Sequence, residues 1–295
     1  MLSRNEMRDL VKKKSKESRL PPQQLYGLYA MDRLILKLSD SVYSSNLIVK
    51  GGFLLTTNLG IDSRATRDMD FTVRNVSFSE NAVADLVAVI EGNSENGNEY
   101  FKIKEVKNIR NDFDYDGYSL TIDYINGKTK IPISVDFTTG EQLVSINEHE
   151  KFKSIFTDEE YSLSSYTVEQ VVVDKFYTLL AYGAYDDTNS RMKDYYDLYL
   201  INTLDDHIDY SLINKGLDQI MKQRDTFIKA CQYDEIINYL HESDHQRGLW
   251  ESYSKKTPYA NDLSFDNVMS EISLLSNELI KNRTLLKEQQ NGYER

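Results

Sequence analysis

Hydrophobic and polar positions along the first 140 residues follow two different periods. Helical spacing covers residues 5–40, with a break near Pro21 and Pro22, and returns at 53–59 and 81–90. Alternating or short apolar runs predict strands at 46–49, 69–73, 100–106, 118–125 and 130–137. The pair Asn126-Gly127 predicts a hairpin between the last two, and Asp116-Gly117 a turn before them.

The second half of the chain has a different pattern. Thr167 and Gln170 have the spacing of a capping box, which predicts a helix from 167 to about 182. Helical spacing then continues to about residue 287, and no internal repeat is present. We therefore expect an α/β (α+β) N-terminal domain at 1–160 and a helical domain at 161–295.

Composition indicates a globular protein outside the membrane. The chain has 295 residues, 28% of them charged, and its mean hydropathy is -0.54. No apolar run approaches the roughly 18 residues of a membrane span, and lysines stand where a signal peptide would be apolar. The single cysteine, Cys231, excludes an internal disulfide and a cysteine-rich zinc site. We expect a cytoplasmic protein and, since no exposed apolar repeat is evident, a monomer.

The net charge of -12 argues against a protein that coats nucleic acid, but it leaves room for a local basic patch. Positive side chains gather at residues 12–19 and again at 281–287. The simplest interpretation of both clusters is a solvated helix face.

Two aspartates in the strand at 69–73 are the first candidate for chemistry. Asp68 and Asp70 are two positions apart, so a strand directs both carboxylates to one face. A divalent metal such as Mg²⁺ offsets the repulsion between them and leaves room for phosphate oxygens. Asp136 ends the strand at 130–137 and would join them if the two strands are neighbours.

A pair of glycines precedes these aspartates, between a predicted strand and a predicted helix. Backbone N–H groups at Gly51 and Gly52 and the positive end of the helix could hold phosphates there. An isolated Asp-x-Asp is more often an exposed strand end, so the upstream glycines are what favour a phosphate site.

The helix beginning at Thr167 carries a lysine on its apolar face. By helical spacing Lys175 lies with Val171, Val172 and Leu179. A lysine in this position either extends to water or meets an anion, because burying an ammonium alone costs several kcal/mol. The anion could be a carboxylate or a nucleotide triphosphate, with Asp174 as an orienting neighbour.

A third cluster is the run RMKDYYDLYL at 191–200. Arg191, Asp194 and Asp197 follow at intervals of three, so a helix would align them on one side. Taken alone, the cluster is well explained as a surface ion pair.

The three clusters in this order resemble the AbiEii/AbiGii toxin family, bacterial nucleotidyltransferases of the DNA polymerase β-like superfamily. The resemblance covers residues of about 45–200. It is carried by KGG at 50–52, by Thr66, Asp68 and Asp70, by the lysine in DKFYTLL, and by the pattern Arg191, Lys193, Asp194, Asp197, Leu198.

The resemblance implies a polymerase-β-like domain with a mixed sheet, followed by a helical domain that completes the active site. Asp68, Asp70, Lys175 and Asp194 would be catalytic, with Asp136 as a further metal ligand. The nucleotide would be bound by Lys50, Gly51, Gly52, Thr66, Lys175 and Arg191. The cofactor would be Mg²⁺ and the substrate a nucleoside triphosphate.

The family also implies a biological role. Related toxins transfer NMP to the 3′ acceptor end of tRNA, which blocks translation and growth in abortive infection, a form of phage defence, and a cognate antitoxin encoded alongside neutralises them. Two alternatives remain open from the residues. One is nucleotidyl transfer to a protein or small molecule, and the other is a non-catalytic module that binds nucleotide or a partner.

Overall fold

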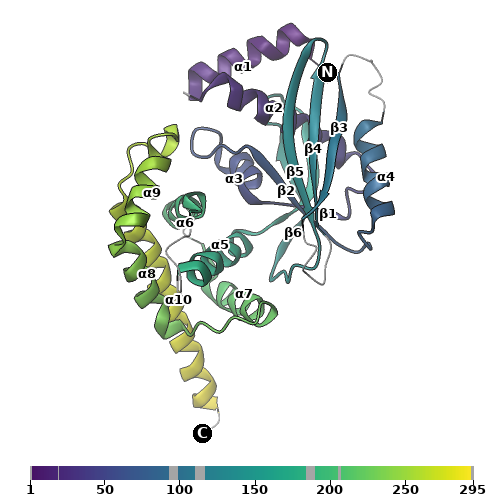
Figure 1. The fold of residues 1–295 in the computed structure, drawn as a ribbon. Coiled ribbons are helices and arrows are strands. Elements are labelled where there is room, and N and C mark those ends of the chain that lie inside the picture. Colours follow the sequence, from purple (N-terminus) through teal and green to yellow (C-terminus); the bar gives the residue numbers. More distant parts are fainter. Residues whose placement is uncertain are drawn as a thin grey trace. The chain divides into compact units, whose positions relative to one another are not determined.

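The computed structural model describes residues 2–18, 20–92, 99–109, 117–183, 190–204 and 207–293. The chain forms two compact units, which are treated one at a time (Figure 1). Unit 1 comprises residues 1–141 and 147–166, and unit 2 comprises residues 142–146 and 167–295. No helix among the described residues is both long enough and apolar enough to cross a membrane.

Unit 1 is built on a mixed seven-stranded sheet in the order β3-β4-β5-β2-β1-β7-β6. The strands are β1 (Leu47–Lys50), β2 (Asp68–Val73), β3 (Glu99–Asn108), β4 (Gly117–Asn126), β5 (Thr129–Thr138), β6 (Ile146–Lys153) and β7 (Glu160–Tyr166). Strand β2 runs parallel to β5 and antiparallel to β1, so it lies in the interior of the sheet.

Four helices accompany this sheet: α1 (Arg4–Ser18), α2 (Pro22–Ser39), α3 (Gly51–Leu59) and α4 (Glu80–Glu91). Helix α2 supplies much of the core, because Leu28, Tyr29 and Ile35 are completely buried. The Tyr29 ring meets the rings of Tyr124 and Phe156 edge to face, at centroid distances of 5.8 and 5.3 Å. Burial of this apolar surface is the main force that joins helix and sheet.

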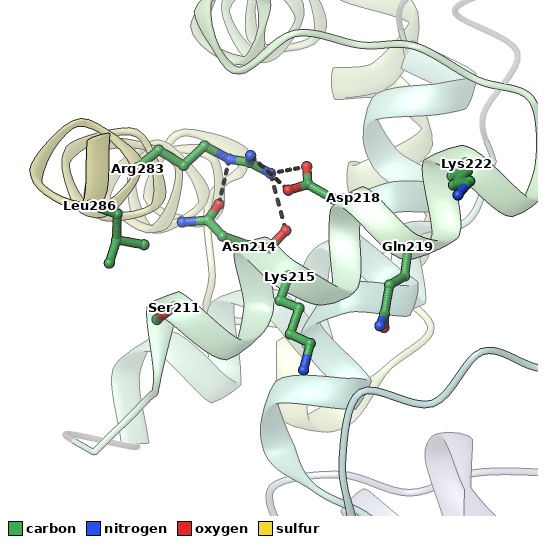
Figure 2. Close-up of a pocket in the computed structure, with 8 residues that line it drawn as sticks. All are labelled: Ser211, Asn214, Lys215, Asp218, Gln219, Lys222, Arg283 and Leu286. Carbon is green, nitrogen blue, oxygen red and sulfur yellow. Dashed lines mark hydrogen bonds and ion pairs between the residues drawn. The ribbon is translucent and has the colours of Figure 1, made fainter. Parts of the chain in front are cut away.

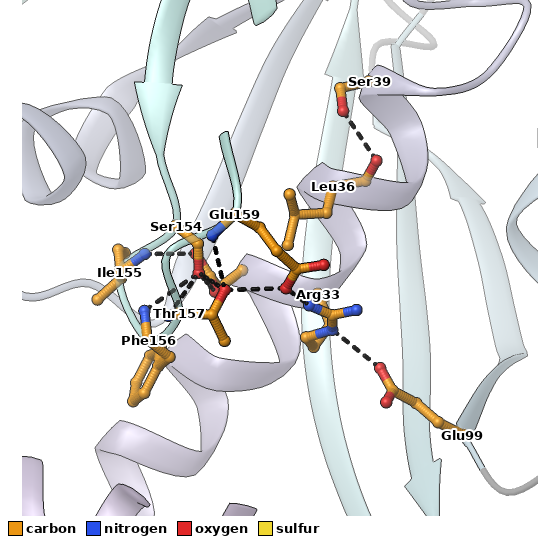
Figure 3. A network of polar contacts seen from close by, with 10 residues as sticks. Arg33, Leu36, Ser39, Glu99, Ser154, Ile155, Phe156, Thr157 and Glu159 are labelled. Atoms are coloured by element: carbon orange, nitrogen blue, oxygen red, sulfur yellow. Dashed lines mark hydrogen bonds and ion pairs between the residues drawn. The ribbon is translucent and has the colours of Figure 1, made fainter. Parts of the chain in front are cut away.

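Polar contacts fix α2 to separate parts of the sheet (Figure 3). The Arg33 guanidinium bonds Glu99 on β3 through Nε at 3.0 Å and Glu159 beside β7 through Nη1 at 2.5 Å. The neighbouring Asp32 is buried and accepts hydrogen bonds from the Ser154 hydroxyl at 2.6 Å and the Ile155 N–H at 2.8 Å.

Helices make up most of the described part of unit 2. Its helices are α5 (Val168–Gly183), α6 (Met192–Leu204), α7 (Tyr210–Gln223), α8 (Tyr233–Glu242), α9 (Asp244–Ser254) and α10 (Phe265–Tyr293), with 3₁₀ turns η1 (Ala230–Gln232) and η2 (Pro258–Ala260). Helix α5 packs against α6, α7 and α8, and α10 packs along α6, α7 and α8. Gly216 in α7 permits close approach, since a Cβ there would lie 3.2 Å from Val144 Cγ1.

The expected fold class is confirmed: a mixed sheet with helices, followed by helices alone. The Asn126-Gly127 hairpin is also confirmed, with Asn126 opposite Thr129 and a positive φ at Gly127. The predicted turn at Asp116-Gly117 falls partly outside the described residues, since 110–116 are not described.

Two strands were missed by the sequence analysis. Strand β6 is an edge strand whose side chains are mostly exposed, so its sequence INEHEKFK contains no apolar alternation. Strand β7 lies between β1 and β6 and buries Ser164 and Ser165, whose polarity hid the burial pattern.

Candidate active site

Three aspartates lie on one face of the sheet in unit 1. In the parallel register of β2 with β5, Asp70 is directly opposite Asp136, and Asp68 precedes Asp70 by two positions. The other face of the same strands is apolar: Phe71 is opposite Phe137 and their rings stack at 5.2 Å. The period of two therefore separates a buried aromatic layer from a carboxylate face, as expected for Asp68 and Asp70.

Gly51 begins α3 and lies directly against the carboxylate of Asp70. A Cβ at Gly51 would overlap Asp70 Oδ2 and lie 3.1 Å from its Cγ. Gly51 also has a φ of +66°, which favours glycine. The Asp70 carboxylate thus occupies the space that a side chain would take at the N-terminus of α3, where the helix dipole favours negative charge.

Gly52 packs against Thr66 and Arg64. A Cβ there would lie 2.8 Å from Thr66 Oγ1 and 2.9 Å from Arg64 Nη2. The Thr66 hydroxyl donates a hydrogen bond to the Asp68 carbonyl at 3.2 Å and accepts one from the Asp68 N–H at 3.3 Å. Thr66 therefore fixes the position where Asp68 enters the strand.

Lys50 lies next to the carboxylate face, opposite Asp70 in the register of β1 with β2. Its ammonium donates to Thr138 Oγ1 at 2.7 Å and pairs with Glu141 Oε1 at 3.1 Å. It also lies 5.8 Å from the centroid of the Tyr166 ring, whose hydroxyl is 2.8 Å from Thr72 Oγ1. Contacts with Thr138, Glu141 and Tyr166, all in unit 1, thus fix the position of the Lys50 ammonium.

The donor set of the carboxylate face suits a divalent metal. Asp136 Oδ1 is buried and has no hydrogen-bond partner among the described residues, which leaves an acceptor for a cation or a proton donor. Within that part of the chain no group of three or more His, Cys, Asp or Glu side chains is arranged to hold a metal ion. Mg²⁺ needs fewer, because it commonly takes one or two carboxylates and completes its shell with water and substrate phosphates.

Lys175 in unit 2 is the centre of a buried ion cluster. Its Nζ lies 2.8 Å from Asp194 Oδ1 and 2.8 Å from Asp197 Oδ2, and its side chain is only 12% exposed. The sequence left open whether Lys175 extends to water or meets an anion. In the structure it meets two carboxylates. Asp174 accepts a hydrogen bond from Gln170 Nε2 at 3.0 Å.

Arg191 extends this cluster toward solvent. Its Nε bonds Asp194 Oδ2 at 2.6 Å while the side chain stays 64% exposed. Burial alone would lower the pKa of Lys175, but Asp197 and Asp194 outweigh it and raise that pKa. Burial likewise opposes ionisation of Asp194, yet Lys175 and Arg191 hold the pKa of Asp194 below its usual value. Lys175 and Asp194 are therefore both charged at neutral pH.

Some residues of these two clusters were not singled out from the sequence. Glu141 and Tyr166 surround Lys50, and Arg64 contacts the position of Gly52; all three lie outside any motif. Asp197 was named in the sequence pattern but was given no role; it is fully buried and contacts Lys175 as closely as Asp194 does. The spacing of three between Asp194 and Asp197 was the available signal for the latter.

A mixed sheet that carries an Asp-x-Asp face beside a Gly-Gly helix start is the arrangement of a nucleotidyltransferase. The chain belongs to the AbiEii family, the nucleotidyl transferase toxins of type IV toxin–antitoxin systems, whose family model matches residues 33–271. This confirms the resemblance found in the sequence. Membership implies a nucleoside triphosphate substrate and an antitoxin partner, and it favours an enzyme over a non-catalytic module.

Solved structures share the fold at low sequence identity. JHP933 from Helicobacter pylori is 14% identical with a TM-score of 0.53, and the match covers 94% of this chain and all of that one. A second H. pylori protein, described as a candidate nucleotidyltransferase, is also 14% identical with a TM-score of 0.53, over 90% of this chain and 99% of its own. No curated protein matches the chain.

Proposed function

We propose that this nucleotidyltransferase is Mg²⁺-dependent and transfers NMP from a nucleoside triphosphate to the 3′ acceptor end of tRNA, and so blocks translation and growth. The observation that carries the proposal is the carboxylate face of β2 and β5, where Asp70 lies opposite Asp136 and against Gly51. Concentrated carboxylates beside a helix N-terminus suit a reaction in which phosphates and cations meet.

Asp68 and Asp70 are the residues that would hold magnesium, with Asp136 as a further ligand. Bound there, the metal would lower the pKa of the attacking hydroxyl and screen the triphosphate. In the reaction the RNA 3′-oxygen forms a bond to the α-phosphorus, the bond from that phosphorus to the bridging oxygen breaks, and pyrophosphate leaves. The hydroxyl proton passes to solvent, and the buried Asp136 Oδ1 remains an acceptor position for the metal.

The remaining residues position the nucleotide. Backbone N–H groups at Gly51 and Gly52 would receive phosphate oxygens at the start of α3. Thr66 holds the Asp68 backbone, and Lys50 contributes positive charge near Asp70 while its own contacts fix it.

We infer that the Lys175, Arg191 and Asp194 cluster of unit 2 has the nucleotide-binding and catalytic roles that the family resemblance implies. Arg191 has an exposed guanidinium, which suits it to contact a triphosphate, and Asp194 orients it. Lys175 would contribute through the same cluster, with its charge shared between Asp194 and Asp197. A phage-defence role and neutralisation by the antitoxin follow from the toxin class and belong to the same proposal.

The test is incubation of the protein with Mg²⁺, total tRNA and each α-labelled nucleoside triphosphate in turn. We expect label on the 3′ end of tRNA with one or two nucleotides, and none after chelation of the metal or with Asp68→Ala. Label on protein or on a small molecule without RNA would support the alternative acceptor instead. Label on tRNA that persists after chelation would contradict the metal assignment.

A further inference from the structure

Helices α1 and α2 lie side by side in unit 1 (Figure 1). A groove between them carries a row of cations. It measures about 550 Å³ and is lined by Arg8, Lys12 and Lys16 from α1 and by Tyr26 from α2. The three cations are four positions apart, so they share one helix face at intervals of about 6 Å. All three cations, and the whole of α1, precede the segment matched by the family model.

The three cationic side chains make no hydrogen bond or ion pair with any part of the chain that the structure describes, and all three are exposed. Asp9 is the acidic residue in the lining, so the groove keeps a surplus of two positive charges. This surplus occurs in a chain whose net charge is -12. Unpaired cations that repel one another lower the stability of a helix by tenths of a kcal/mol per pair, so the row favours an anionic ligand.

The helix that carries the row is held firmly in unit 1. Met7 and Val11 on the same helix are buried, and Val11 also lines the groove below the cations. Arg4 Nε donates to Thr129 Oγ1 at 2.8 Å, and Asn126 Nδ2 donates to the Leu2 carbonyl at 3.3 Å, so the start of α1 is tied to the β4–β5 hairpin. The cations are therefore presented from a fixed support.

A second groove, in unit 2, provides the contrast (Figure 2). It measures about 440 Å³ and lies between α7 and α10, where Arg283 points into a set of acceptors. Arg283 Nε bonds Asn214 Oδ1 at 2.7 Å and Nη2 pairs with Asp218 Oδ1 at 2.7 Å. The Arg283 guanidinium already joins two helices. The other two cations of this groove, Lys215 and Lys222, are seven positions apart and form no row at intervals of four as on α1.

We propose that the α1–α2 groove binds the phosphate backbone of the acceptor RNA. Regularly spaced cations match a polyanion, and the half-buried Tyr26 ring beside them offers a surface on which an unpaired base can stack. That the polyanion is the acceptor RNA rests on the proposed function.

The test measures binding and not transfer. Fluorescently labelled total tRNA is titrated with the full-length protein, without nucleotide, at salt concentrations from 50 to 200 mM. Arg8→Gln/Lys12→Gln/Lys16→Gln should weaken binding roughly 10- to 100-fold at 0.1 M salt and make the slope of log K against log salt shallower by about 2 to 3, at 0.7–0.9 per phosphate contact. All three side chains are exposed, so an unchanged melting temperature is expected and verifies that the variant folds.

The matched control is Lys128→Gln/Lys151→Gln/Lys229→Gln, which removes three exposed cations elsewhere. It should retain most of the affinity and of the salt slope. Equal losses in the two triple variants would mean that overall charge, and not the groove, determines binding. Tyr26→Leu should weaken binding to intact tRNA more than to tRNA trimmed of its single-stranded 3′ end, and equal effects would contradict the stacking role.

Failure of the inference can be distinguished from failure of the proposed function. If the groove variant loses RNA binding while the wild type transfers nothing to tRNA, the groove binds RNA as proposed. The assignment of tRNA as the acceptor of the transferred nucleotide is then wrong. If the wild type labels tRNA and the groove variant binds and labels it equally well, the groove assignment is overturned. Binding of anionic phospholipid vesicles without any binding of tRNA would overturn it as well.

Discussion

Units 1 and 2 both concentrate aspartates, but they balance the charge in different ways. In unit 1, Asp68, Asp70 and Asp136 share a strand face, and the nearby Lys50 ammonium bonds Thr138 and Glu141. In unit 2, Asp194 and Asp197 enclose one ammonium at 2.8 Å each. The unit 2 cluster contains its own countercharge and is suited to positioning. The unit 1 face keeps a buried carboxylate oxygen without a hydrogen-bond partner among the described residues, which suits it to an added cation.

The largest effect that separates the two clusters is expected at Asp68. Asp68→Ala should reduce nucleotidyl transfer by about a thousandfold or more, because a metal-held charge is worth several kcal/mol in the transition state. The free energy of unfolding should change by only about 0.5 kcal/mol, since Asp68 is exposed. Label incorporation and urea denaturation measure the two quantities.

The matched control for Asp68 is Asp62→Ala, an exposed aspartate in the turn before β2. It should keep both activity and stability. An Asp68→Ala protein with full activity would contradict the assignment of the carboxylate face as the metal site.

At Lys175, in contrast to Asp68, the free energy of unfolding should be the quantity that changes most. Lys175→Met removes the ammonium that contacts both Asp194 and Asp197 in a buried setting and should cost about 3–5 kcal/mol of unfolding free energy. Lys175→Arg keeps the charge and should lose less. Urea denaturation distinguishes the two variants, and a Met variant as stable as the wild type would show that the ion cluster is not structural.

The two units also differ in how a single buried carboxylate makes the stability depend on pH. Asp32 is buried with hydrogen bonds from Ser154 and Ile155, and burial raises its pKa to about 6, whereas cations lower the pKa of Asp194. With a folded pKa above the unfolded one, Asp32 binds its proton more tightly in the folded state. Its contribution is present below about pH 4 and lost as the pH rises through about 6, a change on the order of 3 kcal/mol.

Asp32→Asn should remove this part of the pH dependence. Unfolding free energies measured at pH 4, 5, 6 and 7 should fall with rising pH in the wild type relative to the variant. Parallel curves for the two proteins would show that Asp32 does not titrate in this range. The effect belongs to folding and should leave the nucleotide affinity unchanged.

The sequence predicted the local parts of both clusters and not their partners. A period of two placed Asp68 and Asp70 on one face, and a period of 3.6 placed Lys175 where it needs an anion. Which anion it meets depends on how α5 and α6 pack, and the register that brings Asp136 opposite Asp70 depends on sheet order. Helix packing and strand order join residues far apart in the sequence, so the spacing of residues along the chain does not reveal them.

The capping box at the head of α5 shows the same limit at smaller scale. Thr167 Oγ1 accepts from the Gln170 N–H at 3.3 Å, as the spacing predicts. The Gln170 side chain, however, accepts from the Val144 N–H at 2.7 Å and donates to Asp174. Residues 142–146 come from another part of the chain, so the local motif could not reveal this use of Gln170.

The smallest expected effect tests how closely the backbone approaches the carboxylate face. Gly51→Ala should cost about 1–3 kcal/mol of stability because of its positive φ, and its Cβ should displace the Asp70 carboxylate and lower transfer. Gly27→Ala in α2 is the matched control: no atom lies within 4 Å of its Cβ, so alanine should stabilise that helix by about 0.5–1 kcal/mol and keep activity. Thermal unfolding and label incorporation on both variants make the comparison. If Gly51→Ala behaved as Gly27→Ala does, the contact between α3 and Asp70 would have no part in positioning the acidic face.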